Sequence, residues 1–185
     1  MGDTRQSCAV LRAARDRGCS LRTDAPRLKI RSPTPSRAGR KRCELIEYRY
    51  GNDLDLDQVR ELYDASTLAE RRPVDDRAIL ESMVEHANLV VTAWEAGLLV
   101  GLSRTLTDFL YVGYLADLAV RETHQRRGIG QALVERTRER MGPRSMLVLL
   151  AAPKAVDYYP RIGFTRHDSA WVLRASEPLR AGQTD

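Results

Sequence analysis

Cysteine is scarce in this chain, and long apolar runs are missing from it. The three cysteines, Cys8, Cys19 and Cys43, are an odd number and include no Cys-x-x-Cys pair, which argues against a disulfide framework. The longest apolar run, Met146–Ala152, is too short to span a bilayer, and the N-terminus has no apolar core like that of a secretory signal. We therefore expect a cytoplasmic protein that does not associate with membranes.

Histidine is equally rare, and His86, His124 and His167 lie far apart in the sequence. None of them has the spacing that metal ligands share, so we predict no metal site. Ser169 lies close to His167 and next to Asp168, but neighbouring strand residues point to opposite faces and cannot converge as a catalytic triad. The sequence also lacks a Gly-x-Ser-x-Gly elbow, which argues further against a serine hydrolase.

Positive charge is concentrated at the N-terminal end. The whole chain has a net charge of +5, yet residues 1–42 alone carry 12 Lys and Arg against 3 Asp, so the remainder is mildly acidic. A basic segment can contact nucleic acid or anionic lipid, but this one has no aromatic residue to stack on bases. We interpret residues 1–42 as a flexible basic extension with no specific nucleic-acid or membrane partner, with a targeting peptide as the alternative. A folded domain over 43–174 and a C-terminal tail over 175–185 complete the predicted organisation.

Residues 43–174 alternate between strand-like and helix-like apolar patterns. The predicted strands are 43–50, 88–95, 98–107, 111–120, 146–152, 164–166 and 170–174. The predicted helices run from the acidic residues 53–57 to about 69, from 75 or 76 to 85, from 129 onward, and over 155–162. In the second helix we expect Ile79, Leu80 and Met83 to point inward.

Two features of this order indicate the fold class. Ala96-Gly97 between two strand patterns predicts a hairpin, so the sheet begins with antiparallel neighbours. The uniformly apolar strand 146–152 follows a helix, which predicts that it is buried and parallel to the strand 111–120. The sequence therefore predicts an α+β protein with a mixed, mostly antiparallel sheet flanked by helices.

A junction between an apolar strand and an amphipathic helix organises the chain. Gln125-Arg-Arg-Gly128-Ile-Gly130 follows the strand, and one helical stripe then contains Ile129, Ala132, Leu133, Thr137 and Met141. The free amides and positive end of a helix N-terminus bind anions, and glycine lets a phosphate approach the backbone. An ordinary strand–turn–helix, with glycine for tight packing, is the alternative. The spacing does not fit the dinucleotide fingerprint, because Leu133 stands where the third glycine is needed, and the chain has no P-loop.

Two blocks of sequence together resemble one known family. Leu118-x-Val120 followed by Gln125-x-x-Gly128-x-Gly130 is similar to the acyl-CoA pyrophosphate loop of the GNAT superfamily of N-acetyltransferases. Downstream, Ala155–Phe164 is similar to the family's segment of alanine, two aromatic residues, a basic residue and Gly-Phe. The chain departs from the family pattern at Ala152, where asparagine is frequent, at Pro160, and at Thr123-His124 before the loop.

The resemblance implies a fold, a cofactor and an activity. It implies a GNAT-like fold and the transfer of an acetyl group from acetyl-CoA to a primary amine, by direct attack in a ternary complex. A non-catalytic acyl-CoA-binding regulatory module on the same fold is the alternative. The implied cofactor-binding residues are Leu118, Ala119, Val120, Gln125, Arg126, Arg127, Gly128, Ile129, Gly130 and Gln131.

Catalytic roles follow from the same resemblance. Tyr159 occupies the position of the family's tyrosine acid, and a phenol keeps its proton at neutral pH and can donate it to a leaving thiolate. Tyr158 is the competing candidate. Asp117 is the candidate base, or alternatively a polar residue that only anchors its neighbours, and Glu122 and His124 are weaker options for the base.

The acceptor side is less defined. In the family, the first two helices and their connection line the acceptor site, so the resemblance places Arg71, Arg72 and Pro73 close to a substrate. A solvated loop is the alternative for these residues. We expect a small-molecule or peptide amine as the acceptor, and homodimerisation is left open.

Overall fold

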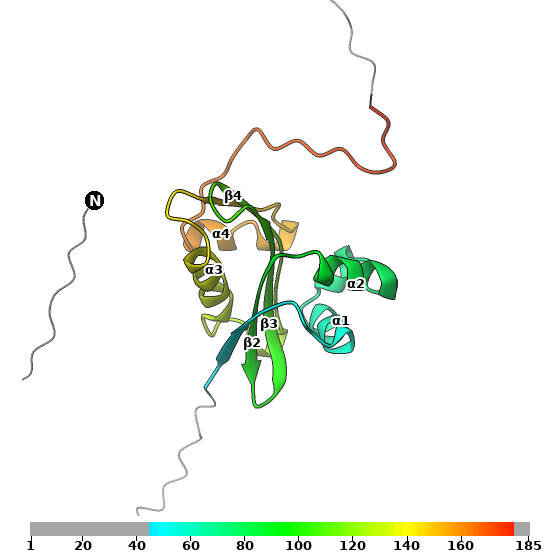
Figure 1. Ribbon diagram of the computed structural model, residues 1–185, viewed down its shortest axis with the longest axis vertical. Coiled ribbons are helices and arrows are strands. Elements are labelled where there is room, and N and C mark those ends of the chain that lie inside the picture. The colour runs from blue at the N-terminus through cyan, green and yellow to red at the C-terminus, as the bar shows by residue number, and fades with distance from the viewer. Residues whose placement is uncertain (1–44, 180–185) are drawn as a thin grey trace, which may run out of the picture. The chain divides into compact units, whose positions relative to one another are not determined.

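The computed structural model describes residues 45–179. The predicted extension 1–42, the start of the first strand and the last residues of the C-terminal tail lie outside the described residues. One sheet forms the centre of the domain, in the order β1-β2-β3-β4-β5 (Figure 1). Its strands are β1 (Glu47–Tyr50), β2 (Leu89–Glu95), β3 (Leu98–Thr107), β4 (Val112–Val120) and β5 (Met146–Val148). Strands β1 to β4 pair antiparallel and β5 pairs parallel to β4, which confirms the predicted mixed sheet.

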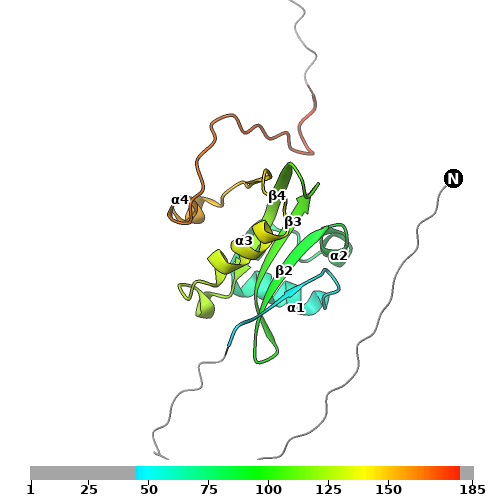
Figure 2. The same ribbon diagram turned by 60° about the vertical axis from the view of Figure 1, so that its left-hand side comes forward.

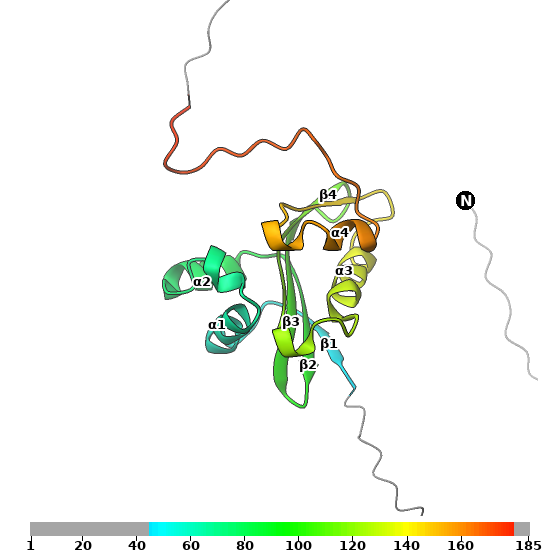
Figure 3. The same ribbon diagram turned by 180° about the vertical axis from the view of Figure 1, so that it is seen from behind.

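Helices cover both faces of this sheet. Helices α1 (Leu56–Ala65) and α2 (Arg77–Glu85) lie on one face and α3 (Ile129–Glu139) lies on the other (Figure 3). Three 3₁₀ turns and a short helix complete the described part of the chain: η1 (Leu68–Arg71), η2 (Glu122–His124), η3 (Pro153–Ala155) and α4 (Tyr158–Arg161). Asp55 caps α1 by accepting a hydrogen bond from one backbone amide of the first turn, and Asp76 caps α2 by accepting from two.

Each face of the sheet has its own hydrophobic core. The core under α1 and α2 includes Val59, Leu62, Tyr63, Leu80, Val84, Leu99 and Leu102. The core under α3 includes Val91, Val100, Ile129, Leu133 and Met141. The inward position predicted for Ile79 is wrong, because its side chain is 45% exposed. Leu80 and Val84, four residues apart, form the buried stripe of α2, and Ile79 lies about 100° around the helix from Leu80.

The hairpin between β2 and β3 forms where the sequence predicts it. Ala96 and Gly97 both have positive φ, 50° and 82°, which is the backbone of a type I′ turn. This turn matches the right-handed twist of paired strands, so it sets the register of the two central strands.

Strand β4 contains a bulge that shapes the rest of the domain. Arg104 pairs with Asp117 but the next residue, Thr105, pairs with Leu115, so Ala116 is an extra residue in β4. Residues on the two sides of the bulge therefore alternate out of phase. β4 pairs with β5 only through Val112–Tyr114, and its remaining residues continue beyond this pairing.

The C-terminal part differs most from the prediction. The strand expected over 146–152 is only three residues long, and it is half-exposed rather than buried. The strands expected over 164–166 and 170–174 do not form, and this segment runs away from the sheet (Figures 1 and 2). Trp171 is consequently 93% exposed. The first helix is also shorter than predicted: it ends at Ala65, and Thr67, with φ of 64°, separates it from η1.

Candidate functional site

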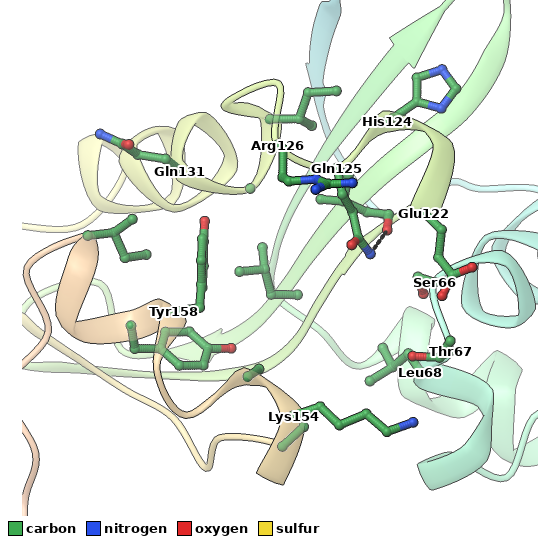
Figure 4. Close-up of a pocket in the computed structure, with 18 of the residues that line it drawn as sticks. Ser66, Thr67, Leu68, Glu122, His124, Gln125, Arg126, Gln131, Lys154 and Tyr158 are labelled. Atoms are coloured by element: carbon green, nitrogen blue, oxygen red, sulfur yellow. Dashed lines mark hydrogen bonds between the residues drawn. The ribbon is translucent and has the colours of Figure 1, made fainter.

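A cavity of about 740 Å³ opens where β4 extends beyond its pairing with β5. Three segments form its walls: the end of α1 with η1, the end of β4 with the turn into α3, and the chain from η3 to α4 (Figure 4). The first wall contributes Ser66, Thr67, Leu68, Glu70 and Arg71. The second contributes Leu118, Val120, Glu122, His124, Gln125, Arg126, Gly128, Ile129, Gly130 and Gln131. The third contributes Ala152, Pro153, Lys154, Ala155, Tyr158, Tyr159 and Ile162.

The turn into α3 is shaped to receive an anion. Gly128 is the N-cap of α3, with a φ of 80°, and no side chain caps the amides of the first turn. A Cβ on Gly128 would meet no protein atom within 4 Å, so the space beside its backbone is open. Arg126, also at positive φ, lines the cavity and adds a cation. Uncapped amides, open space and a cation are what a phosphate needs at a helix N-terminus.

The turn is anchored to the β2–β3 hairpin by Glu95. The Glu95 carboxylate accepts a hydrogen bond from Arg127 at 2.5 Å, and His124 Nε2 lies 2.8 Å from its other oxygen. The hydrogen bond from Arg127 and the contact with His124 lower the pKa of Glu95 to about 2. Arg127 therefore helps to fix the position of the loop, whereas Arg126 faces the cavity.

Two adjacent tyrosines line the wall opposite the turn. The Tyr158 hydroxyl lies 2.8 Å from the position that a Cβ on Gly130 would take, so it lies against the first turn of α3. Tyr159 packs edge-to-face on Tyr158 and on Phe164. Burial is the main cause that raises the pKa of both phenols, so both keep their proton at neutral pH.

Asp117 lies outside the cavity lining. Its side chain is fully buried and accepts hydrogen bonds from Tyr63 Oη at 2.9 Å and from Nε of Arg72 and of Arg104 at 2.5 Å each. Burial is the main cause that raises the pKa of Tyr63, which therefore remains a donor. Both oxygens of the Asp117 carboxylate therefore already have hydrogen-bond donors from the protein.

The structure brings most of the predicted cofactor residues to one cavity. Ala119 and Arg127 are the exceptions, since the Ala119 side chain belongs to the core under α1 and α2 and Arg127 is paired with Glu95. The weaker base candidates Glu122 and His124 both line the cavity. Figure 4 shows Glu122 directed toward Ser66 and Thr67, and His124 at the rim, turned away.

Several lining residues have no signal in the sequence. Glu70 and Lys154 approach to 3.6 Å across the cavity, from segments far apart in the chain. Ser66 and Thr67 line the cavity because α1 ends at Ala65. The sequence predicts a longer helix that includes both residues, so it does not indicate their position in the cavity. The Gln125 side chain donates to the Val120 carbonyl at 3.1 Å, which holds the loop against the end of β4 (Figure 4).

Residues 45–179 contain neither a metal-binding cluster nor a helix that could cross a membrane. No group of His, Cys, Asp and Glu side chains in this part of the chain is arranged to hold a metal ion. Among the helices of the described residues, none has the length and apolar character needed to cross a membrane.

Comparison with known proteins gives a consistent picture. A family model described as an acetyltransferase (GNAT) domain matches residues 61–174. A GNAT family acetyltransferase from Streptococcus pneumoniae is similar in structure, with a TM-score of 0.56, 23% identity, and coverage of 70% of this chain and 99% of that one. No curated protein is significantly similar in sequence.

Two further structures with the same fold were solved with ligands. An aminoglycoside N-acetyltransferase in complex with CoA has a TM-score of 0.57 and 18% identity, over 74% of this chain and 98% of that one. An aminoglycoside acetyltransferase from an uncultured soil metagenomic sample, in complex with sisomicin, has a TM-score of 0.52 and 20% identity, over 73% and 97%. At these identities the likeness shows a shared fold.

Proposed function

The chain belongs to the GNAT acetyltransferase family, and on this premise we propose that it transfers an acetyl group from acetyl-CoA to a primary amine. The observation that carries the proposal is a single cavity that joins an anion-binding turn to a protonated tyrosine. Reaction by direct attack within a ternary complex needs a cofactor site and an acceptor site that open into each other. The walls of this cavity supply both.

The turn into α3 fits the pyrophosphate of acetyl-CoA. In this proposal, uncapped amides at Gly130 and Gln131 and the Arg126 guanidinium bind the phosphates, and the backbone of Leu118–Val120 holds the pantetheine arm. Bound acetyl-CoA would supply the thioester that is attacked and the thiolate that leaves. The solved relative with CoA supports this choice of cofactor.

Tyr159 is the proposed acid. Its hydroxyl keeps the proton because burial raises the pKa, and it lines the same cavity as the turn. Proton donation lets the sulfur leave as the neutral thiol, which is a better leaving group than the thiolate. Tyr158 lies against Gly130, so we assign it to the wall of the cofactor site.

Glu122 is the proposed contact for the acceptor amine. Its exposed carboxylate lines the cavity near Ser66 and Thr67, where an ammonium ion could bind and lose a proton to it or to a nearby water. Asp117, the base candidate from the sequence, is buried and bonded to two arginines, so we favour its alternative role as an anchor. The solved relative with sisomicin supports a cationic amine as acceptor, either a small molecule or a peptide.

The cellular setting remains part of the proposal. The odd number of cysteines and their lack of a pairing pattern support the cytoplasm, a reducing compartment. We propose no specific nucleic-acid partner and no membrane partner. Homodimerisation stays open, and sedimentation of the purified protein would test it.

A panel of amines tests the proposed function. The unaltered protein is incubated with acetyl-CoA and each amine, and release of free thiol is measured. We expect turnover with at least one cationic amine, and Tyr159→Phe should lower kcat by about 100-fold or more while the Kd for acetyl-CoA changes little.

The matched control is Tyr158→Phe, which removes the hydroxyl of the adjacent ring and should retain most of the kcat. Binding of acetyl-CoA without thiol release for any amine would favour the non-catalytic module. Equal losses of kcat in the two variants would refute the assignment of the acid.

A further inference from the structure

A buried cluster of charges lies at the β4 bulge, behind the wall of the cavity. The Asp117 side chain has no exposed surface, and the Arg104 and Arg72 side chains are 9% and 24% exposed. Each arginine places Nε within 2.5 Å of a different oxygen of the carboxylate. The cluster is more than an ion pair, because Tyr63 also donates to the same carboxylate.

The donors in the cluster come from separate elements. Tyr63 belongs to α1, Arg104 belongs to β3, and Arg72 follows η1. Arg104 also donates to the Met83 carbonyl of α2 at 3.1 Å. Asp117 therefore connects α1 and the end of η1 to the central strands, and Arg104 connects α2 to the same cluster.

Arg72 contacts both the buried carboxylate and the backbone of β4. In addition to Asp117, its guanidinium donates to the carbonyl of Ala116 at 2.7 Å. Ala116 is the extra residue of the β4 bulge, and the cavity opens beyond that point. A planar guanidinium can reach both acceptors at once, whereas a lysine ammonium in the same place would bind as a point charge.

The segment that Arg72 holds forms the acceptor wall. Ser66, Thr67, Leu68, Glu70 and Arg71 all line the cavity and come immediately before Arg72 in the chain. The backbone hydrogen bonds of this segment are local, from Thr67 to Asp64 and from Arg72 to Ala69. Thr67 has a left-handed backbone, which costs a non-glycine residue about 1 kcal/mol, so the segment needs support from elsewhere.

We propose that Arg72 is a positioning residue that locks the acceptor wall onto the β4 bulge, with Asp117 as its buried anchor. The statement that this wall binds the acceptor rests on the proposed function. The attachment of the wall to the β4 bulge through Arg72 is a structural property. It assigns Asp117 a role that needs no proton transfer. It also assigns different tasks to two neighbouring arginines, since Arg71 faces the cavity and Arg72 faces the strand.

Hydrogen exchange and kinetics of Arg72 variants test the proposal. Arg72→Met removes both contacts, and Arg72→Lys keeps the charge but loses the planar fork. We expect exchange of the amides in residues 67–74 to rise by about tenfold, with no change at the start of α3. We expect the KM for the acceptor to rise by about tenfold, while the Kd for acetyl-CoA stays within about twofold.

Arg60→Met is the matched control, since it removes an arginine from the same region. Arg60 pairs with Asp75 in an exposed ion pair, so its loss should change neither exchange nor KM. Unchanged exchange over residues 67–74 in both Arg72 variants would overturn the proposal. If the unaltered protein acetylates no amine, the proposed function fails, and hydrogen exchange still decides the role of Arg72.

Discussion

Replacing Gly128 by alanine tests two properties of this glycine. One is its left-handed backbone conformation, and the other is the open space beside its backbone. Its φ of 80° lies in the left-handed region, where a Cβ costs about 1–2 kcal/mol. A Cβ at this position meets no protein atom within 4 Å, so no steric clash adds to that cost. We expect a loss of about 3–6 °C in Tm for a domain of this size.

The Gly128→Ala variant should also bind acetyl-CoA more weakly, in addition to its loss of stability. The added methyl group would stand in the open space beside the uncapped amides, where a phosphate would approach. Loss of one charge-assisted hydrogen bond, worth about 1.5–3 kcal/mol, corresponds to an affinity about 10- to 100-fold weaker. Isothermal titration with acetyl-CoA, well below the Tm of the variant, measures this effect directly.

Gly97→Ala provides the matched control. Gly97 has almost the same φ, 82°, and a Cβ there also meets nothing within 4 Å, but it lies in the β2–β3 turn. Both variants should lose similar Tm, and only Gly128→Ala should lose affinity. Equal affinity for acetyl-CoA in the two variants would refute the proposal that the turn at Gly128 binds the cofactor.

Three other predictions concern stability. Arg104→Met should cost about 1.5–3 kcal/mol in urea unfolding, because it removes one of the three side-chain donors to the buried Asp117 carboxylate and the side-chain donor to the Met83 carbonyl, and a loss below about 1 kcal/mol would contradict this. The pKa of Glu95 is lowered from 4.5 to about 2, so its contribution is fully present above pH 4.5 and is lost as the pH falls toward 2. The difference in Tm between the unaltered protein and Glu95→Gln should shrink over that range, and a constant difference would argue against the ion pair. Gly113→Ala should cost about 1–3 kcal/mol, because its Cβ would lie 2.8 Å from the Met141 Cε, and the cost should fall in a Met141→Ala background when measured as a double-mutant cycle.

Local signals in the sequence were sufficient for several elements. Ala96-Gly97 predicted the hairpin because positive φ at two successive residues is a property of the turn itself. Asp75 or Asp76 predicted the start of α2 because capping involves only the next few residues, and Asp76 is the cap in the structure. Strand β4, the glycine turn and helix α3, which form the second wall of the cavity, were also predictable, since their apolar periodicity is local.

Long-range contacts explain what the sequence did not reveal. Asp117 meets Tyr63 and Arg72, which lie 54 and 45 residues away, and no local pattern marks such a cluster. Arg126 and Arg127 are identical in type, and only the position of Glu95 across the hairpin decides which one faces the cavity. Strand β5 has an apolar sequence typical of a buried strand, but its burial depends on whether other segments cover it.

The open C-terminal segment has a spectroscopic consequence. The chain has only two tryptophans, and they differ in how far they are exposed to solvent. Trp94 donates its indole N–H to Thr92 and lies under the Arg49 guanidinium, while Trp171 is 93% exposed. Fluorescence from Trp171 should therefore be red-shifted and open to quenching by iodide, and that of Trp94 should be protected. A blue shift that disappears in Trp171→Phe would report directly on whatever covers the C-terminal segment in solution.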